Sequence, residues 1–320
     1  MDAVANTADG VEASRAPEER LPVLVVCNRH SGRGTGWSLA EQLVDRLRQA
    51  DCEAVLRQTE LDGSTFADAT ADRFRCAVIV GGDGSFHAAV NQLTDLELPL
   101  AFFGTGTINV LSLERQLPRE PDAVARLVLA GKTAEVPLLR ALGRRFVLFA
   151  EVGWLAGVVA DVNAWRARAG KHGRLEFVRF GMARMMRSGG RPLRLRLWTP
   201  AGDVLERSCA NVLMTRARIY GGSMKVPMLS PREQPLEDAA FTVVIQRGSS
   251  VIGHASYLTA GGLGLLRAKG RSAELCLATE VEVQGPERTP VHLDAESDGL
   301  EVRWPIRFGP DGSSIRLLVP

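Results

Sequence analysis

The segment Gly81-Gly82-Asp83-Gly84-Ser85 places a carboxylate in a glycine-rich stretch, directly after the apolar run from Cys76 to Val80. Glycines accept positive φ and carry no Cβ, so backbone N–H groups in such a loop can converge on phosphate oxygens. The helix expected next adds its positive end. An anionic Asp83 beside phosphate needs a cation or a hydroxyl proton between the two. The combination indicates phosphoryl transfer, although the same residues also form tight turns after buried strands.

Two other loops have a similar character. Asn28 to Gly34 follows an apolar run and leads into a helical pattern, and its Asn28 and Ser31 suit a phosphate or a ribose. It has neither the Lys-Ser/Thr of a Walker loop nor the Gly-x-Gly-x-x-Gly of a dinucleotide fold. Gly104 to Asn109 has Thr107 at or near a helix N-cap, where its hydroxyl caps the helix or binds phosphate. Together the three loops favour nucleotide binding.

Short apolar runs alternate with helical patterns in the first hundred residues, which predicts βαβ units and a parallel sheet. Ligands of such sheets bind beyond the carboxyl ends of the strands. We therefore expect the glycine loops and the loop that begins at Thr59 to line one cleft. The expected strands are 21–27, 53–56, 76–80 and 98–103, and the expected helices are 37–49, 65–73 and 86–93.

After Gly131 the pattern changes to strand-like runs separated by turn signals, with helices near 173–188 and 251–267. This predicts a second, mainly antiparallel β-rich domain. A length of 320 residues fits two domains. We divide the chain into a flexible tail (1–20), an α/β nucleotide-binding domain (21–138) and a β-rich domain (139–311), with a final strand (312–320) that can return to the first domain.

The bulk composition excludes several classes of protein. The chain is 45% hydrophobic and 24% charged, with a net charge of +2, which is typical of a soluble globular protein without a preference for nucleic acid. Its five cysteines are widely spaced and its histidines lack metal-ligand spacing, which indicates reduced thiols in a cytoplasmic protein. We expect no signal peptide and no membrane-spanning run.

In residue type, order and spacing, the chain resembles the diacylglycerol kinase catalytic family, which includes bacterial lipid kinases, sphingosine kinases and ceramide kinases. The resemblance begins with 28–34, Gly81 to Ser85 followed by Asn91 and Leu93, and 106–111. It continues with 218–222, Pro227 and Leu236-Glu237-Asp238, and it closes with Leu293-Asp294-Ala295-Glu296 and the strand 315–320. It covers nearly the whole chain after residue 20.

The resemblance implies an α/β fold like that of NAD kinase and phosphofructokinase, a β-rich lipid-binding domain, and ATP with Mg²⁺ in the cleft between them. Asp83 would act through the nucleotide's Mg²⁺, and Glu296 would take the proton from a lipid hydroxyl, with Asp294 beside it. Asp238 matches a structural Mg²⁺ ligand, but it also suits a solvated turn after Pro235. The residues implied to hold ATP are Asn28, Ser31, Gly32, Thr59, Gly81, Gly82, Asp83, Gly84, Ser85 and Thr107.

Two positions depart from the family pattern. Ala295 replaces the middle glycine of the Asp-Gly-Glu motif, and Ala88 replaces an acidic residue of the helix after the glycine loop. Alanine costs little at position 295 unless the backbone there needs positive φ. The absence of a carboxylate at position 88 alters how the site binds metal, so a weakly active or inactive protein is an alternative.

The segment 166–196 holds ten Lys or Arg residues and one acid, Glu176. Within it Leu175, Val178, Met182 and Met185 recur at helical spacing. A basic amphipathic helix is typical of membrane-surface or partner binding, although an ordinary core-facing helix with a solvated basic face has the same pattern. Because the implied substrate is a lipid, we expect peripheral attachment to anionic membranes. The sequence does not decide whether the chain forms a homodimer.

The leading hypothesis is therefore an ATP-dependent lipid kinase of phospholipid metabolism that phosphorylates a diacylglycerol-like or ceramide/sphingoid hydroxyl at the membrane surface. The sequence does not identify the acceptor lipid, because an apolar pocket selects its ligand by shape rather than through a motif. One alternative is an NAD kinase-like enzyme, which shares the Gly-Gly-Asp-Gly loop. Another is a nucleotide-dependent lipid-binding regulatory protein that has lost turnover.

Overall fold

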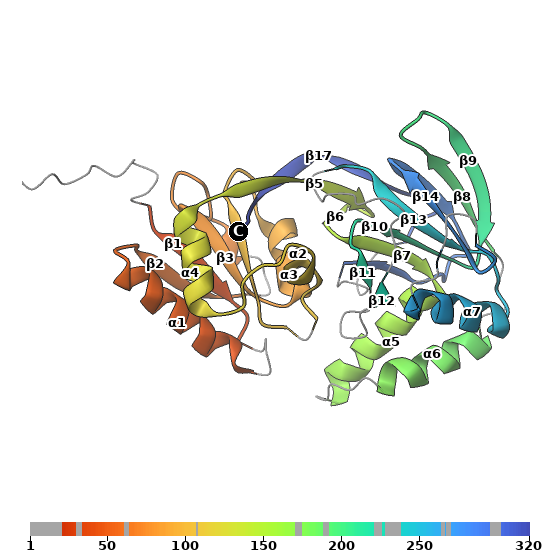
Figure 1. Cartoon of the computed structure of the whole chain (residues 1–320), viewed down its shortest axis with the longest axis horizontal. Helices are drawn as coiled ribbons and strands as arrows, with labels where there is room; N and C mark the ends of the chain where they lie inside the picture. Colours follow the sequence, from red (N-terminus) through yellow and green to blue (C-terminus); the bar gives the residue numbers. More distant parts are fainter. Residues whose placement is uncertain are drawn as a thin grey trace, which may run out of the picture.

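Two lobes joined by a pair of long strands make up the chain in a computed structural model (Figure 1). The residues that it describes are 21–29, 34–60, 64–106, 108–169, 175–187, 192–220, 226–227, 238–263, 266, 270–294 and 302–320.

Four parallel strands form the centre of the first lobe: β1 (Val23–Cys27), β2 (Ala54–Gln58), β3 (Cys76–Gly81) and β4 (Leu100–Gly104). Helices α1 (Gly36–Gln49) and α4 (Pro121–Ala130) cover one face, and α2 (Asp83–Gln92) and α3 (Val110–Glu114) lie on the other. Strands β1, β3 and β4 are buried along their whole length, because helices cover both faces of the sheet. This explains why they form continuous apolar runs in the sequence.

The expected helix over 65–73 is wrong. Only one 3-10 turn, η3 (Ser64–Phe66), forms there. Polar side chains hold this stretch locally: Thr65 Oγ1 accepts a hydrogen bond from Glu60 N, and Asp95 Oδ2 accepts one from Ala71 N. Such side-chain bonds to the backbone compete with a helix.

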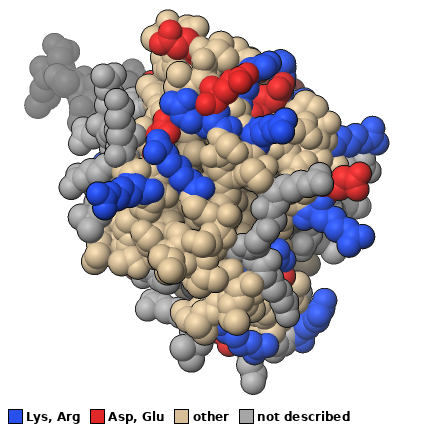
Figure 2. Space-filling model, turned by 90° about the vertical axis from the view of Figure 1, so that its right-hand side faces the viewer, with Lys and Arg blue, Asp and Glu red and all other residues tan. Residues whose placement is uncertain are grey.

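Two packed sheets form the second lobe. A five-stranded antiparallel sheet has the order β14 (Ala273–Ala278), β13 (Phe241–Gln246), β10 (Asn211–Thr215), β7 (Phe149–Gly153) and β16 (Val291–Leu293). Facing it are β8 (Leu193–Trp198), β9 (Val204–Cys209) and β15 (Glu280–Gln284), which share one apolar core with it. Residues of β8 alternate between buried and exposed, and cross-strand ion pairs such as Arg196–Glu206 cover the outer face. Acidic and basic side chains lie together in the upper part of Figure 2. A short hairpin, β11 (Ile219–Tyr220) and β12 (Val226–Pro227), completes the described strands of this lobe.

Three helices cover the other face of the five-stranded sheet: α5 (Trp154–Ala169), α6 (Leu175–Arg187) and α7 (Val251–Gly262) (Figure 1). Val158 of α5 and Tyr257 of α7 pack in one apolar cluster with Leu213 of β10. Among the described helices, none is long and apolar enough to cross a membrane.

Strands β5 (Thr133–Ala141) and β17 (Ile306–Leu318) run antiparallel from one lobe to the other, and β6 (Arg144–Phe146) pairs with β5. Strand β17 pairs with β15 in the second lobe and with β4 in the first, so one ten-stranded sheet runs through the molecule. The expected boundaries at 138/139 and 311/312 fall inside these strands, and the domain division stays a prediction. The predicted fold class, a parallel α/β part followed by a mainly antiparallel β-rich part, is confirmed.

Candidate active site

The loops that follow β1 to β4 meet at one edge of the parallel sheet. The registers pair Cys27 with both Gln58 and Val80, and Gly81 with Gly104, so these strands end at the same level. Backbone hydrogen bonds tie the loops together, because Thr59 N donates to Cys27 O at 3.0 Å. Of the predicted nucleotide-binding residues, Asn28 therefore lies beside the end of β3, and Thr59 lies on the other side of Asn28 at the same edge.

The two glycine loops after β3 and β4 pack directly against each other. Thr105 N donates to Gly81 O at 2.8 Å, and a Cβ on Gly106 would lie 2.7 Å from Gly82 Cα. A Cβ on Gly81 would collide with the Ser85 side chain. None of these glycines has a positive φ. Of the two glycine properties expected here, the missing Cβ is therefore the one that the structure uses, because it allows the close approach of the two backbones.

Asp83 is the first residue of α2, and its carboxylate bonds to the start of α3. Oδ2 accepts from Val110 N at 3.1 Å and Oδ1 from Leu111 N at 3.4 Å. Burial, with a smaller contribution from the negative charge of Asp294, raises the pKa of Asp83 to about 6, against the effect of these two N–H bonds. A cation beside Asp83 would favour its ionised form.

Asp294 follows β16 and is only 5% exposed. Its Oδ1 accepts from Leu148 N at 2.8 Å and Phe149 N at 2.9 Å, and its Oδ2 accepts from Val147 N at 2.7 Å. His87 Nδ1 lies 3.3 Å from the same Oδ2. Burial opposes ionisation, but the His87 bond and the backbone N–H bonds outweigh it and hold the pKa of Asp294 below its ordinary value.

The four hydrogen-bond donors around Asp294 limit the ability of its carboxylate to accept a proton. Both oxygens are occupied by two donors each, and the left-handed backbone, with φ 47°, keeps the carboxylate in place. A carboxylate that is ionised and saturated with donors is a poor proton acceptor. The geometry therefore narrows the expected role of Asp294 to that of a fixed negative charge.

Helix α2 carries Asp83, His87 and Asn91 at intervals of four residues, so the three lie along one face. His87 is buried and reaches Asp294. Asn91 accepts from Arg145 N at 2.8 Å and donates to Arg145 O at 2.9 Å, which fastens α2 to β6. The sequence analysis missed His87 and Arg145, although the four-residue spacing of polar side chains from Asp83 could have indicated this face.

A second contact between the lobes starts at the end of α3. The buried Glu114 carboxylate accepts from Arg218 N at 2.7 Å and from Arg218 Nε at 3.1 Å. Both helices that begin at the glycine loops thus reach the second lobe. By contrast, His292 of β16 is no acid–base candidate, because burial lowers its pKa to about 4 and keeps it neutral at physiological pH.

Four expected site residues, Ser31, Gly32, Thr107 and Glu296, lie outside the described residues, as does Ala295. The structure brings together Asn28, Thr59, the segment 81–85 and Asp294.

The described part of the chain contains no cluster of three or more His, Cys, Asp or Glu side chains able to hold a metal ion. Asp238 is exposed, its Oδ1 accepts from Ala240 N at 2.9 Å, and its carbonyl accepts from buried Arg216. This is a local turn, and a metal ion at Asp238 stays a prediction. Asp83 fits a nucleotide-bound Mg²⁺ better, because a hard cation prefers carboxylate oxygen and would offset the repulsion from Asp294.

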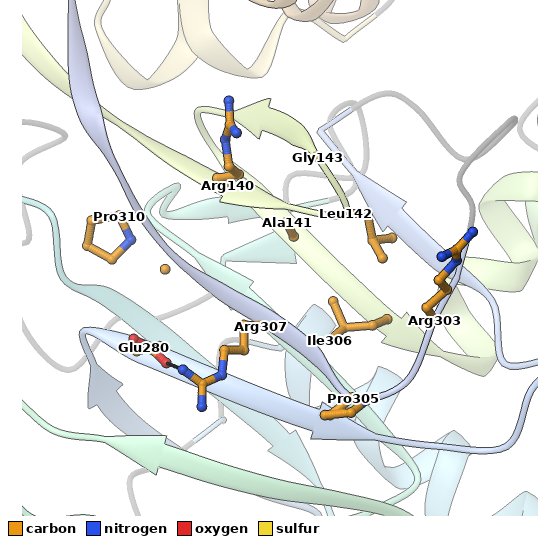
Figure 3. A pocket seen from close by; sticks show the side chains of 11 residues that line it. Arg140, Ala141, Leu142, Gly143, Glu280, Arg303, Pro305, Ile306, Arg307 and Pro310 are labelled. Carbon is orange, nitrogen blue, oxygen red and sulfur yellow. Dashed lines mark ion pairs between the residues drawn. The ribbon is translucent and has the colours of Figure 1, made fainter.

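A hollow of about 530 Å³ lies elsewhere, between the β5–β6 turn and β17 (Figure 3). Arginines line it, but Arg140 pairs with Asp311 and Arg307 with Glu282. None of the residues expected to bind nucleotide contributes to it. We assign it no role in phosphate binding.

The fold is shared with solved structures of both lipid and dinucleotide kinases. A diacylglycerol kinase-like protein from Bacillus anthracis str. Sterne superposes with a TM-score of 0.73 at 18% identity, over 97% of this chain and 98% of that one. A second B. anthracis diacylglycerol kinase structure gives 0.67 at 18% identity, over 93% and 97%. Yeast NADH kinase complexed with NADH gives 0.53 at 10% identity, over 94% and 84%. At these identities the likeness establishes the fold.

The family match is more specific. Residues 22–141 match the diacylglycerol kinase catalytic domain, which confirms the resemblance found in the sequence for this part of the chain. No curated protein matches the chain.

Proposed function

We propose that the protein is an ATP-dependent lipid kinase that phosphorylates a hydroxyl of a diacylglycerol-like or ceramide/sphingoid lipid. One observation carries the proposal. Helix α2, which begins at the glycine loop with Asp83, reaches Asp294 of the other lobe through His87. The glycine segment expected to bind nucleotide and Asp294, which precedes the expected base by two residues, therefore lie close together, which supports transfer between two substrates.

The chain's own residues divide the work as follows. The glycine segment 81–85, which includes the positive end of α2, orients the phosphates. A bound Mg²⁺, near Asp83, would neutralise charge on the phosphates. The lipid hydroxyl oxygen attacks the γ-phosphorus, its bond to phosphorus forms as the bond to the ADP oxygen breaks, and its proton passes to the Glu296 carboxylate. Asp294 supplies a fixed negative charge and takes no proton.

Labelled ATP with Mg²⁺ and a panel of acceptors tests the proposal. The panel contains diacylglycerol, ceramide, sphingosine, phosphatidylglycerol and NAD. We expect label on one of the lipids, and loss of this labelling in Asp83→Asn and Glu296→Gln. Label on NAD alone would contradict the lipid assignment, and equal labelling by wild type and both variants would contradict the residue roles.

An NAD kinase-like activity is the second candidate, and the superposition on yeast NADH kinase is the observation in its favour. The family match over 22–141 and the basic segment 166–196 favour a lipid instead. A lipid-binding regulatory protein without turnover is the third candidate, because Ala88 on α2 supplies no carboxylate. Absence of labelling in wild type with retained ATP binding would select it.

We also propose that the protein acts in the cytoplasm and attaches peripherally to anionic membranes through the basic segment 166–196. In the described part of this segment Arg179 is exposed, whereas Arg184 is paired with Asp161. Each basic residue near an anionic leaflet adds about 1 kcal/mol. Equal binding to neutral and anionic vesicles would contradict a charge-driven attachment.

A further inference from the structure

Exposed apolar side chains concentrate on two helices of the second lobe. Of the nine large hydrophobic residues exposed in the described part of the chain, seven lie on α6, on α7 or directly after α7. The seven, which we call the apolar platform, are Val178, Met182, Met186, Val251, Ile252, Leu258 and Leu263. The other two, Val55 and Val204, lie on separate strands.

Helix α6 has apolar residues on two of its sides. Phe180 and Met185 pack against the core. Val178, Met182 and Met186 follow one another at intervals of four residues and point to solvent, and Met186 is 80% exposed. The sequence analysis had placed Met182 and Met185 on one stripe, and the structure separates them. The outward stripe is therefore not needed for packing in this chain.

Helix α7 has no charged residue among its twelve positions. Its inner side packs through buried His254 and Tyr257, while Ile252 on the outer side is 82% exposed. The outward face of a surface helix in a soluble protein is normally polar or charged. An uncharged outer face suits a helix that lies against an apolar phase.

The two helices form one surface. Helices α6 and α7 contact each other, and Figure 1 shows them side by side beneath the five-stranded sheet. In the lower part of Figure 2, most of the coloured atoms are uncharged, with a few Lys and Arg groups and little acidic surface. Exposed patches of this kind mark interaction sites.

The surrounding charge identifies the occupant. Arg168 and Arg179 are exposed on α5 and α6, whereas Arg194 and Arg196 of the segment 166–196 lie on β8 of the other sheet. An apolar face bordered by positive charge complements an anionic lipid surface, where the side chains enter the acyl boundary and the arginines meet the headgroups. We propose that the apolar platform inserts into the interface of a lipid membrane, with α7 as well as α6 in contact with it. This deepens the proposed function, because it names the surface that would bring a lipid kinase to its substrate.

Vesicle binding by the full chain tests the platform without ATP and without any acceptor lipid. Ile252→Glu and Met182→Glu each remove one platform side chain, and Val204→Glu is the matched control, because Val204 is 50% exposed on β9. The vesicles are phosphatidylcholine alone and phosphatidylcholine with phosphatidylglycerol. We expect each platform variant to lower partitioning about tenfold on both vesicles, and the control to change it less than about twofold.

Equal partitioning of wild type and both platform variants would overturn the proposal, provided that all variants keep the wild-type Tm. Light scattering after gel filtration tests whether a second copy of the chain covers the platform instead. If the wild type is a dimer, and Ile252→Glu makes it monomeric without changing vesicle binding, the membrane proposal is also overturned. A chain that labels no lipid but shows the tenfold loss would refute the proposed function and leave the platform intact. Labelling of a lipid by the wild type, together with unchanged vesicle partitioning of the platform variants, would refute the platform and support the proposed function.

Discussion

At the residue scale, Asp83 and Asp294 belong to one polar cluster, but their pKa values are shifted in opposite directions. Burial and the charge of Asp294 raise the pKa of Asp83 to about 6, whereas donors on both oxygens keep the pKa of Asp294 low. Asp83 is thus the group whose charge a neighbouring cation can control, and Asp294 is a constant anion. Two carboxylates with separated pKa values are characteristic of catalytic sites.

The raised pKa of Asp83 predicts a pH-dependent stability. Because the folded-state pKa lies above the unfolded value of 3.8, the folded protein binds more protons between the two, and stability is lost as the pH rises through about 6. Asp83→Asn has no such loss. Allowing for the partial exposure of Asp83, we expect the variant to gain about 1 to 2 kcal/mol relative to wild type between acidic and neutral pH. Urea unfolding without nucleotide measures this, and a pH-independent difference would contradict it.

His87 is predicted to be a positioning residue, because it donates to Asp294 from the helix that begins with Asp83. His87→Leu removes the donor, and we expect kcat to fall at least about tenfold with little change in the KM for ATP. His87→Asn keeps an N–H near the position of Nδ1 and should restore most of kcat. If His87→Asn were as impaired as His87→Leu, with both folded by circular dichroism, the hydrogen bond would not be the cause.

At the element scale, the site depends on how closely the two glycine loops approach. Thr105 and Gly106 bond to Gly81 O, and Gly106 lies against Gly82. These contacts fix the starts of both α2 and α3. Backbone, rather than flexible side chains, fills the space between the loops.

Gly106→Ala tests that arrangement. Its Cβ would come 2.7 Å from Gly82 Cα, so one loop must move, and we expect ATP affinity measured by calorimetry to fall at least about tenfold. Gly181→Ala is the control, since a Cβ there meets nothing within 4 Å beyond its own helix. Gly181→Ala should leave affinity unchanged and raise stability by about 0.5 to 1 kcal/mol. Similar affinities for both variants would contradict the close-packing explanation.

At the scale of the whole molecule, β17 makes the lobes mutually dependent. Its first residues pair with β15, its last with β4, and it lies along β5 for most of its length. Ile315 and Leu317 are buried in the core of the first lobe, although they come from the end of the chain. The part that matches the family model, 22–141, therefore lacks a central strand of its own sheet.

A fragment of residues 22–141 should consequently fold poorly by itself. Without β17 the edge of β4 and one side of β5 are unpaired, and such edges promote aggregation. We expect the fragment to be mostly aggregated in gel filtration, and a version with 306–320 attached through a flexible linker to be monomeric with a cooperative thermal transition. A monomeric, cooperative fragment without 306–320 would contradict this dependence.

The sequence by itself determined much of the fold. Continuous apolar runs predicted β1, β3 and β4, because strands covered on both faces need no polar positions. The sequence also predicted a glycine loop over 81–85 and a helix from residue 86, but α2 already begins at Asp83, so only Gly82 separates it from β3. The helix expected at 65–73 failed, since side-chain bonds to the backbone are not visible in periodicity.

Only the tertiary structure decided the contacts between distant segments. His87 and Asp294 are 207 residues apart, and the three N–H groups on Asp294 come from the start of β7 and the two residues before it, 145 to 147 residues away. The separation of Met182 from Met185 and the joining of α6 with α7 likewise depend on which side of each helix faces the sheet. Local patterns fix periodicity, whereas the direction in which a side chain points is set by what packs against it.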